Sequence, residues 1–201
     1  AEARLEATRR WFEEVVVAER LCPFAPPLLA DPWKLRLVAS RAAGPDGVVA
    51  EVGAEAELLV QGLRPQDARG KMPETTLLVL DERWDFVRDW RGLVRLSWRL
   101  QSEAILDRGF AAAVQLVLFH PGASHSAYDD GPADAADYSI RAPHPTVHLL
   151  READVLRNAS SPSLTRHFSF RAVQTYPTAD QIPTRNKARL RSQGLAACEA
   201  R

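Results

Sequence analysis

The stretch ETTLLVLD, residues 74–81, is rich in β-branched and apolar side chains. A strand of this composition is typical of a sheet that is covered on both faces. The stretch AAAVQLVLFHP at 111–121 has the same character, and the proline that follows His120 holds this histidine in extended geometry at the end of the strand. The stretch WKLRLVAS at 33–40 alternates apolar and basic residues, as a half-buried strand does. We therefore expect three strands.

Helical patterns separate these strands. Apolar residues recur at helical spacing over residues 1–21, 48–63 and 84–106. A final helix is expected from about Pro183 to Gly194, with the glycine as its C-cap. Alternating strands and helices favour the α/β class, here a single-domain layered sandwich with a small central mixed or parallel sheet flanked by helices. A chain of 201 residues is long enough for one such domain, spanning 1–201.

The last third of the chain contains a long loop and another predicted helix. Residues 122–139 are rich in Gly, Ala, Ser and Asp and have no apolar period, and loops of this length are usually functional or mobile. Pro145 fits the first turn of a helix, where its missing N–H costs nothing. We therefore predict that TVHLLREADVLRNA, residues 146–159, continues as a helix.

Composition excludes several classes of function. The chain has 26 basic and 26 acidic residues, so its charge does not favour a nucleic-acid partner. No stretch approaches the roughly 20 apolar residues of a membrane-spanning helix. We expect a soluble protein, cytoplasmic or organellar after removal of a targeting peptide. The two cysteines are far apart in the sequence and form no disulfide framework. The sequence has no glycine-rich phosphate-binding loop, so it gives no indication of a nucleotide cofactor.

Several short motifs occur together along the chain. They are LCPFA at 21–25, ETTLL at 74–78, FHP at 119–121, an acidic loop ending near Tyr138, HLLRE at 148–152 and IPTRN at 182–186. In order and spacing they resemble the bacterial and plastid-type family known as domain of unknown function 1415, over nearly the whole chain. The resemblance brings a shared domain and no established reaction.

The resemblance also assigns individual positions to the family's pattern. These are Cys22, Pro23, Phe24, Glu74, Thr75, Thr76, Gln115, Phe119, His120, Pro121, Tyr138, Arg141, Pro143, Pro145, His148, Arg151, Glu152 and Asn186. This chain is a divergent member, because His144 stands where similar proteins have an aromatic residue and residues 160–176 resemble an irregular insertion.

A metal centre is one hypothesis for the site. On the predicted helix His148 and Glu152 lie one turn apart on the same face, and His120 at the end of a strand would be the third ligand. Two histidines and one carboxylate suit zinc or non-haem iron. The alternative is that His148 is a hydrogen-bonded core histidine and that Glu152 pairs with an arginine.

Catalysis by side chains alone is a second hypothesis. Cys22 would be a nucleophile, with His120 or His148 as its base. Its predicted position at the carboxyl end of a helix disfavours the thiolate form. The alternative to a nucleophile is that Cys22 packs in the core as a small apolar side chain. Glu74 opens a buried strand and needs Arg141 or Arg151 as a partner. Such a pair would clamp a substrate carboxylate or phosphate, or simply fix the loop.

Two functions follow from these patterns. The first is a metal-assisted hydrolase or oxidase of a small molecule, with a pocket beyond the end of strand 113–120. The second is a non-catalytic accessory or assembly subunit that binds other protein subunits of a larger complex, an organellar one included, through the insertion at 160–176. The sequence leaves open whether the protein is an enzyme.

Overall fold

Four short strands form one mixed sheet with the order β1-β2-β4-β3. The strands are β1 (Leu35–Ala39), β2 (Thr75–Val79), β3 (Val114–Phe119) and β4 (Thr146–Arg151). The pair β1 and β2 is parallel, and β4 runs antiparallel to both β2 and β3. The computed structural model describes residues 1–62, 72–126, 132–154 and 181–200. The predicted α/β class with a small mixed sheet is confirmed.

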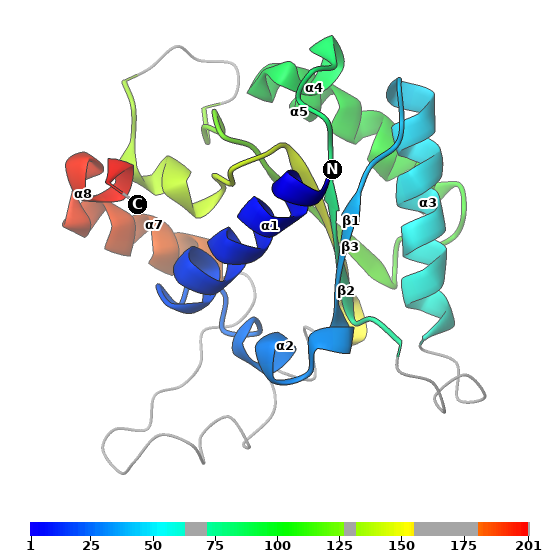
Figure 1. The fold of residues 1–201 in the computed structure, drawn as a ribbon, viewed down its shortest axis with the longest axis horizontal. Helices are drawn as coiled ribbons and strands as arrows, with labels where there is room; N and C mark the ends of the chain where they lie inside the picture. The colour runs from blue at the N-terminus through cyan, green and yellow to red at the C-terminus, as the bar shows by residue number, and fades with distance from the viewer. Residues whose placement is uncertain (63–71, 127–131, 155–180, 201) are drawn as a thin grey trace.

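Helices cover both faces of this sheet, which Figure 1 shows edge-on between α3 and α1. The helical segments are α1 (Glu2–Trp11), continued by the π-helical η1 (Phe12–Val17), α2 (Pro26–Ala30), η2 (Pro32–Lys34), α3 (Pro45–Gln61), α4 (Asp85–Arg88), α5 (Trp90–Arg99), continued by the π-helical η3 (Leu100–Leu106), η4 (Ala135–Ser139), α7 (Gln181–Gln193) and α8 (Leu195–Glu199). The helices predicted at 1–21, 48–63, 84–106 and 183–194 are thus found, and Gly194 follows α7 with a φ of 85°.

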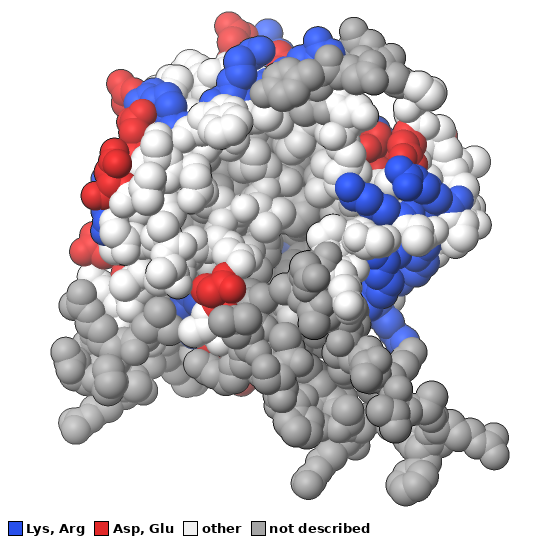
Figure 2. Space-filling model, turned by 180° about the vertical axis from the view of Figure 1, so that it is seen from behind, with Lys and Arg blue, Asp and Glu red and all other residues white. Residues whose placement is uncertain are grey.

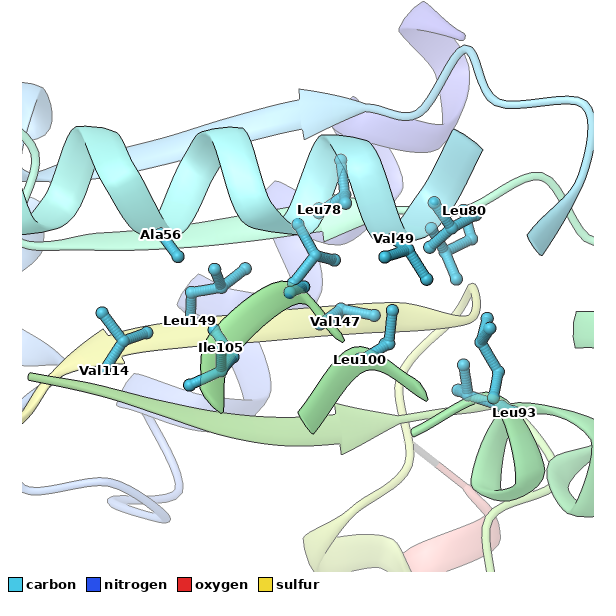
Figure 3. Close-up of a cluster of buried hydrophobic side chains, with 14 of the residues drawn as sticks. Val49, Ala56, Leu78, Leu80, Leu93, Leu100, Ile105, Val114, Val147 and Leu149 are labelled. Atoms are coloured by element: carbon cyan, nitrogen blue, oxygen red, sulfur yellow. The ribbon is translucent and has the colours of Figure 1, made fainter. Parts of the chain in front are cut away.

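The larger core lies between one face of the sheet and the helices α3 and α5–η3, as Figure 3 shows. Alternate residues of each strand point into it, among them Leu78 of β2 and Leu149 of β4, both without exposed surface. Ile105 of η3 meets them from the helical side. This face is therefore closed by apolar packing.

The opposite face of the sheet is covered by α1, η1 and the segment that leads to α2. Phe12 and Val16 pack there against Leu77 of β2. A smaller cluster joins Leu21 to Leu190 of α7, so that the segment after η1 and the last two helices lie together on this side of the sheet (Figure 1). This face contains the cavity described below.

The helix predicted at 146–159 is wrong over its first six residues. Residues 146–151 form the strand β4, not the start of a helix, because β2 and β3 supply backbone hydrogen-bond partners on both sides. Pro145 precedes the strand, where a residue without an N–H is also tolerated, and its carbonyl accepts a 2.8 Å hydrogen bond from the Leu80 amide. A proline at N1 of a helix and a proline before a strand look alike in sequence.

Two further expectations concern membranes and the insertion. In the part of the chain that the structure describes, no helix has the length and apolarity to cross a membrane. The insertion expected at 160–176 lies outside the described residues.

Candidate functional site

A cavity of about 260 Å³ lies between the sheet and the segments that cover its second face. Its floor is the face of β2, β3 and β4 that points away from the larger core. The side chains on this floor are Thr75, Leu77, Gln115, Val117, Phe119, His148 and Leu150. Its walls come from α1–η1, the LCPFA segment and the first turns of α7, and include Trp11, Phe12, Leu21, Cys22, Phe24, Leu28, Ile182 and Asn186. The lining is mainly apolar, so the few polar groups in it can be considered singly.

His148 occupies the centre of the cavity floor. In the strand register it lies between Leu77 on β2 and Val117 on β3, both of which also line the cavity. Its ring centroid is 5.9 Å from that of Phe119. Burial among these apolar groups disfavours the charged imidazolium and lowers the pKa of His148 to about 4. His148 is therefore neutral at physiological pH.

The hydrogen bonds of Thr75 determine which nitrogen of His148 carries the proton. The Thr75 hydroxyl donates to the carbonyl oxygen of Leu149 over 2.7 Å, and Thr75 Oγ1 lies 2.7 Å from His148 Nε2. Because the hydroxyl has one hydrogen, Nε2–H must be the donor to Oγ1. Nδ1 then keeps its lone pair and makes no hydrogen bond within the described residues. It can accept a hydrogen bond from a molecule in the cavity.

Cys22 lines the cavity from the wall that faces the sheet. Burial raises the pKa of the Cys22 thiol, although the amides of Phe24 and Ala25 and the charge of Arg185 act in the opposite direction. Its setting differs from the predicted one, since η1 ends at Val17 and Cys22 lies in the turn before α2. The amides, rather than the end of a helix, are its polar neighbours.

Ion-paired side chains form part of the cavity lining, namely Glu74, Arg151 and Asp154. Glu74 Oε1 lies 3.2 Å from Lys34 Nζ and 3.9 Å from Arg151 Nη2. Arg151 also pairs with Asp154, and both of these side chains are more than nine-tenths buried. The expected pairing of Glu74 with Arg151 is confirmed, with Lys34 as a second, closer partner.

His120 follows the last residue of β3, as predicted, but its side chain turns to the other face of the sheet. Its ring lies 6.2 Å from that of Trp90. Nδ1 accepts the Gly122 amide over 2.9 Å, so Nε2–H must donate to the Val87 carbonyl over 3.2 Å. Both ring nitrogens are thus used in fixing the chain, and burial lowers the pKa of His120.

The structure does not bring the three predicted metal ligands together. His120 and His148 lie on opposite faces of the sheet, and the Glu152 carboxylate accepts a hydrogen bond from the side-chain amide of Gln115. Among the described residues, no group of three His, Cys, Asp or Glu side chains is placed to hold a metal ion. The alternative to a metal centre was that Glu152 pairs with an arginine. The structure instead pairs the Glu152 carboxylate with the Gln115 side chain.

Arg141 is also absent from the cavity lining. Its Nε donates to the Ala123 carbonyl over 3.1 Å, and its guanidinium lies over the ring of Tyr138 at 4.4 Å. It lines a separate surface hollow beside α1 and α8. The structure therefore keeps Cys22, Glu74 and His148 around one cavity and places His120 and Arg141 outside it.

The sequence missed the way in which distant segments form this site. Asn186 of α7 is buried and donates to the Leu21 carbonyl over 2.6 Å, which joins the IPTRN and LCPFA motifs across 165 positions of the chain. Trp11 reaches the floor as well, with its ring 5.1 Å from that of Phe119. The family motifs were the available signal for this site. LCPFA and IPTRN contribute residues to its walls, and HLLRE contributes His148 and Leu150 to its floor.

The fold and the cavity define an α/β domain with a small-molecule-sized site on one face of its sheet. The chain belongs to the family described as "Protein of unknown function (DUF1415)", whose model matches residues 3–200. No curated protein and no solved structure matches the chain. The predicted family is thus confirmed, and the function has to be argued from the cavity.

Proposed function

We propose that this protein binds a small, mainly apolar molecule in the sheet-face cavity and holds a hydrogen-bond donor of that molecule on His148. The observation that carries the proposal is the Nδ1 of a neutral histidine, which has no hydrogen-bond partner among the described residues and lies at the centre of a mainly apolar floor. Ligand sites typically combine an apolar lining with a few placed polar groups.

The size of the cavity indicates the size of the molecule. An engineered cavity of about 150 Å³ is known to hold benzene, whereas pockets for drug-sized ligands begin near about 300 Å³. At about 260 Å³ the cavity suits a molecule between these limits, such as a two-ring aromatic compound or a medium-length chain.

The protonation states favour binding over nucleophilic catalysis. A thiol of raised pKa and an imidazole of pKa about 4 remain neutral together near pH 7. An activated cysteine–histidine pair would instead be partly ionised, with a lowered thiol pKa. We therefore assign Cys22 to the wall of the binding site.

Neither function expected from the sequence has support of this kind. Metal-assisted hydrolysis or oxidation was based on His120, His148 and Glu152, which lie apart. The accessory-subunit hypothesis was based on residues 160–176, which lie outside the described residues, so it stays a prediction.

Calorimetric titration with two matched compounds tests the proposal. 2-Naphthol has a hydroxyl donor, and 2-methoxynaphthalene has the same rings without one. We expect 2-naphthol to bind about tenfold more tightly, since one hydrogen bond in an apolar site contributes about 1 kcal/mol or somewhat more. The variant His148→Phe should abolish this preference and still bind both compounds.

A matched control uses a second histidine. His144 pairs with Glu82 and does not line the cavity, so His144→Phe should keep the preference for 2-naphthol. Failure of the wild-type protein to bind either compound would overturn the proposal, as would an unchanged preference in His148→Phe.

A further inference from the structure

Helix α7 brings positive charge to one wall of the cavity. Between Gln181 and Gln193 it has four basic residues and no acidic one. These are Arg185, Lys187, Arg189 and Arg191. Figure 2 shows the molecule from behind, with Lys and Arg side chains gathered on the side where α7 lies and few charged side chains at the centre of the view.

Two of these four basic residues pair with carboxylates. Arg189 lies 3.3 Å from Glu19, and Arg191 lies 2.5 Å from Asp134. Their charges are compensated within the described part of the chain.

The other two basic residues have no carboxylate partner among the described residues. Arg185 donates to the Arg20 carbonyl over 2.9 Å and to the Asn186 side-chain oxygen over 3.2 Å, and both of these acceptors are neutral. Lys187 forms no ion pair within the described residues either. Both side chains are partly exposed, so a ligand can reach them.

Neither of these cations lines the cavity, but both flank Asn186, which does, and the Arg185 guanidinium is hydrogen-bonded to the Asn186 side chain. Their helix contributes Ile182, Pro183 and Asn186 to its lining. The charge of Arg185 lowers the pKa of the Cys22 thiol, and the charge of Lys187 lowers the pKa of the His125 imidazole. Cys22 and His125 both line the cavity. The first turns of α7 are also the positive end of the helix dipole.

Negative charge near this wall offsets only part of that positive charge. The carboxylate of Asp137 accepts the His125 amide over 2.9 Å, and its charge raises the pKa of Arg191. Elsewhere in the cavity lining, Glu74 and Arg151 belong to an ion-pair network that includes Lys34. Among the described residues, the uncompensated positive charge of the lining segments is therefore on α7.

We propose that the ligand of the cavity is an amphipathic anion. Its mainly apolar part, with the hydrogen-bond donor that His148 accepts, would lie on the sheet, and its acidic group, a carboxylate or a phosphate, would lie at Arg185 and Lys187. This inference rests on the proposed function, since it names the chemical class of the molecule that the same cavity binds. Arginine and lysine are the side chains that pair with such groups.

Titration calorimetry with octanoate and methyl octanoate tests this inference, because the two compounds share a chain and differ in charge. We expect octanoate to bind at least about tenfold more tightly in 50 mM NaCl. The advantage should fall in 500 mM NaCl, since partly exposed charges are screened by salt.

Charge-removing variants locate the effect. Lys187→Gln, alone and combined with Arg185→Gln, should weaken octanoate binding stepwise, to about the affinity of the ester in the double variant, and leave the ester unaffected. Arg191→Gln removes the same charge from the same helix at a residue that is already paired with Asp134, so it should leave octanoate binding nearly unchanged. The single Lys187 variant changes no hydrogen bond of the described residues, so the test does not depend on the fold of the double variant.

The possible outcomes separate this inference from the proposed function. Equal affinity for octanoate and its ester overturns the anionic ligand and leaves the apolar cavity site in place. An equal loss in Arg191→Gln and in Lys187→Gln shows a general charge effect and also overturns it. If neither the octanoyl compounds nor the naphthalene compounds bind, the proposed function fails and this inference fails with it.

Discussion

His148 and Thr75, on the neighbouring strands β4 and β2, form a 2.7 Å contact that places the imidazole proton on Nε2. The contact has this polarity because the Thr75 hydroxyl is already committed to the Leu149 carbonyl. A backbone carbonyl thus determines, through one hydroxyl, that His148 Nδ1 is an acceptor toward the cavity. The chemistry of the site follows from the sheet register as much as from the identity of its residues.

The low pKa of His148 predicts a loss of stability in mild acid. The imidazole has a pKa of about 4 in the folded protein and about 6.5 in the unfolded chain, so between these values the unfolded state binds more protons. The free energy of unfolding should therefore fall by roughly 2 to 3 kcal/mol from this residue as the pH decreases from 6.5 to 4.

Urea unfolding at several pH values between 4 and 7 measures this effect. His148→Phe should flatten the pH dependence. Some dependence will persist in His148→Phe, because burial also lowers the pKa of His120 and of His125. A wild-type stability that stays constant over this range would contradict the assignment.

Cys22 should react slowly with iodoacetamide. Burial raises its thiol pKa, so at pH 7.5 the reactive thiolate is rarer than in a free thiol. In a Cys198→Ser background, we expect alkylation at least about tenfold slower than that of glutathione at this pH, and faster as the pH is raised. Mass spectrometry over a time course gives the rate.

A second variant checks the cause of the slow reaction. The charge of Arg185 lowers the Cys22 pKa, so Arg185→Gln should slow alkylation further at the same pH. Alkylation as fast as that of glutathione would restore the view of Cys22 as an activated nucleophile.

His120 should prove structural. His120→Ala leaves the Gly122 amide and the Val87 carbonyl without their side-chain partner, and we expect it to reduce the free energy of unfolding by about 2 to 4 kcal/mol. Binding of 2-naphthol by the folded fraction should remain as in the wild-type protein, because His120 lies on the face of the sheet away from the cavity. A specific loss of binding with unchanged stability would refute this role.

Local patterns in the sequence were sufficient for much of the fold. The apolar stretch at 74–81 and the alternation at 33–40 mark two of the strands, and helical periodicity marks α3 and α5. These signals are local, since each element shows its own period of burial. The position of His120 at a strand end was equally predictable, because Pro121 fixes the preceding residue in extended geometry.

The cavity could not be predicted in this way. It depends on which face of the sheet each side chain takes, and the helix predicted at 146–159 put His148 and Glu152 in the wrong geometry. It also depends on contacts such as that of Asn186 with Leu21, which no local period encodes. The family motifs indicated the residues of the site but not their arrangement.

Adjacent leucines of β4 provide the most direct test of this correction. In the strand, Leu149 points into the core and has no exposed surface, whereas Leu150 points to the opposite face and lines the cavity. Leu149→Ala should therefore reduce the free energy of unfolding by about 2 to 5 kcal/mol, the usual range for a buried leucine. Leu150→Ala should cost clearly less and change the affinity for 2-naphthol instead, because it enlarges the cavity. Urea unfolding and calorimetric titration of both variants make the comparison, and equal effects of the two substitutions on both measurements would contradict the alternation of faces that places His148 in the cavity.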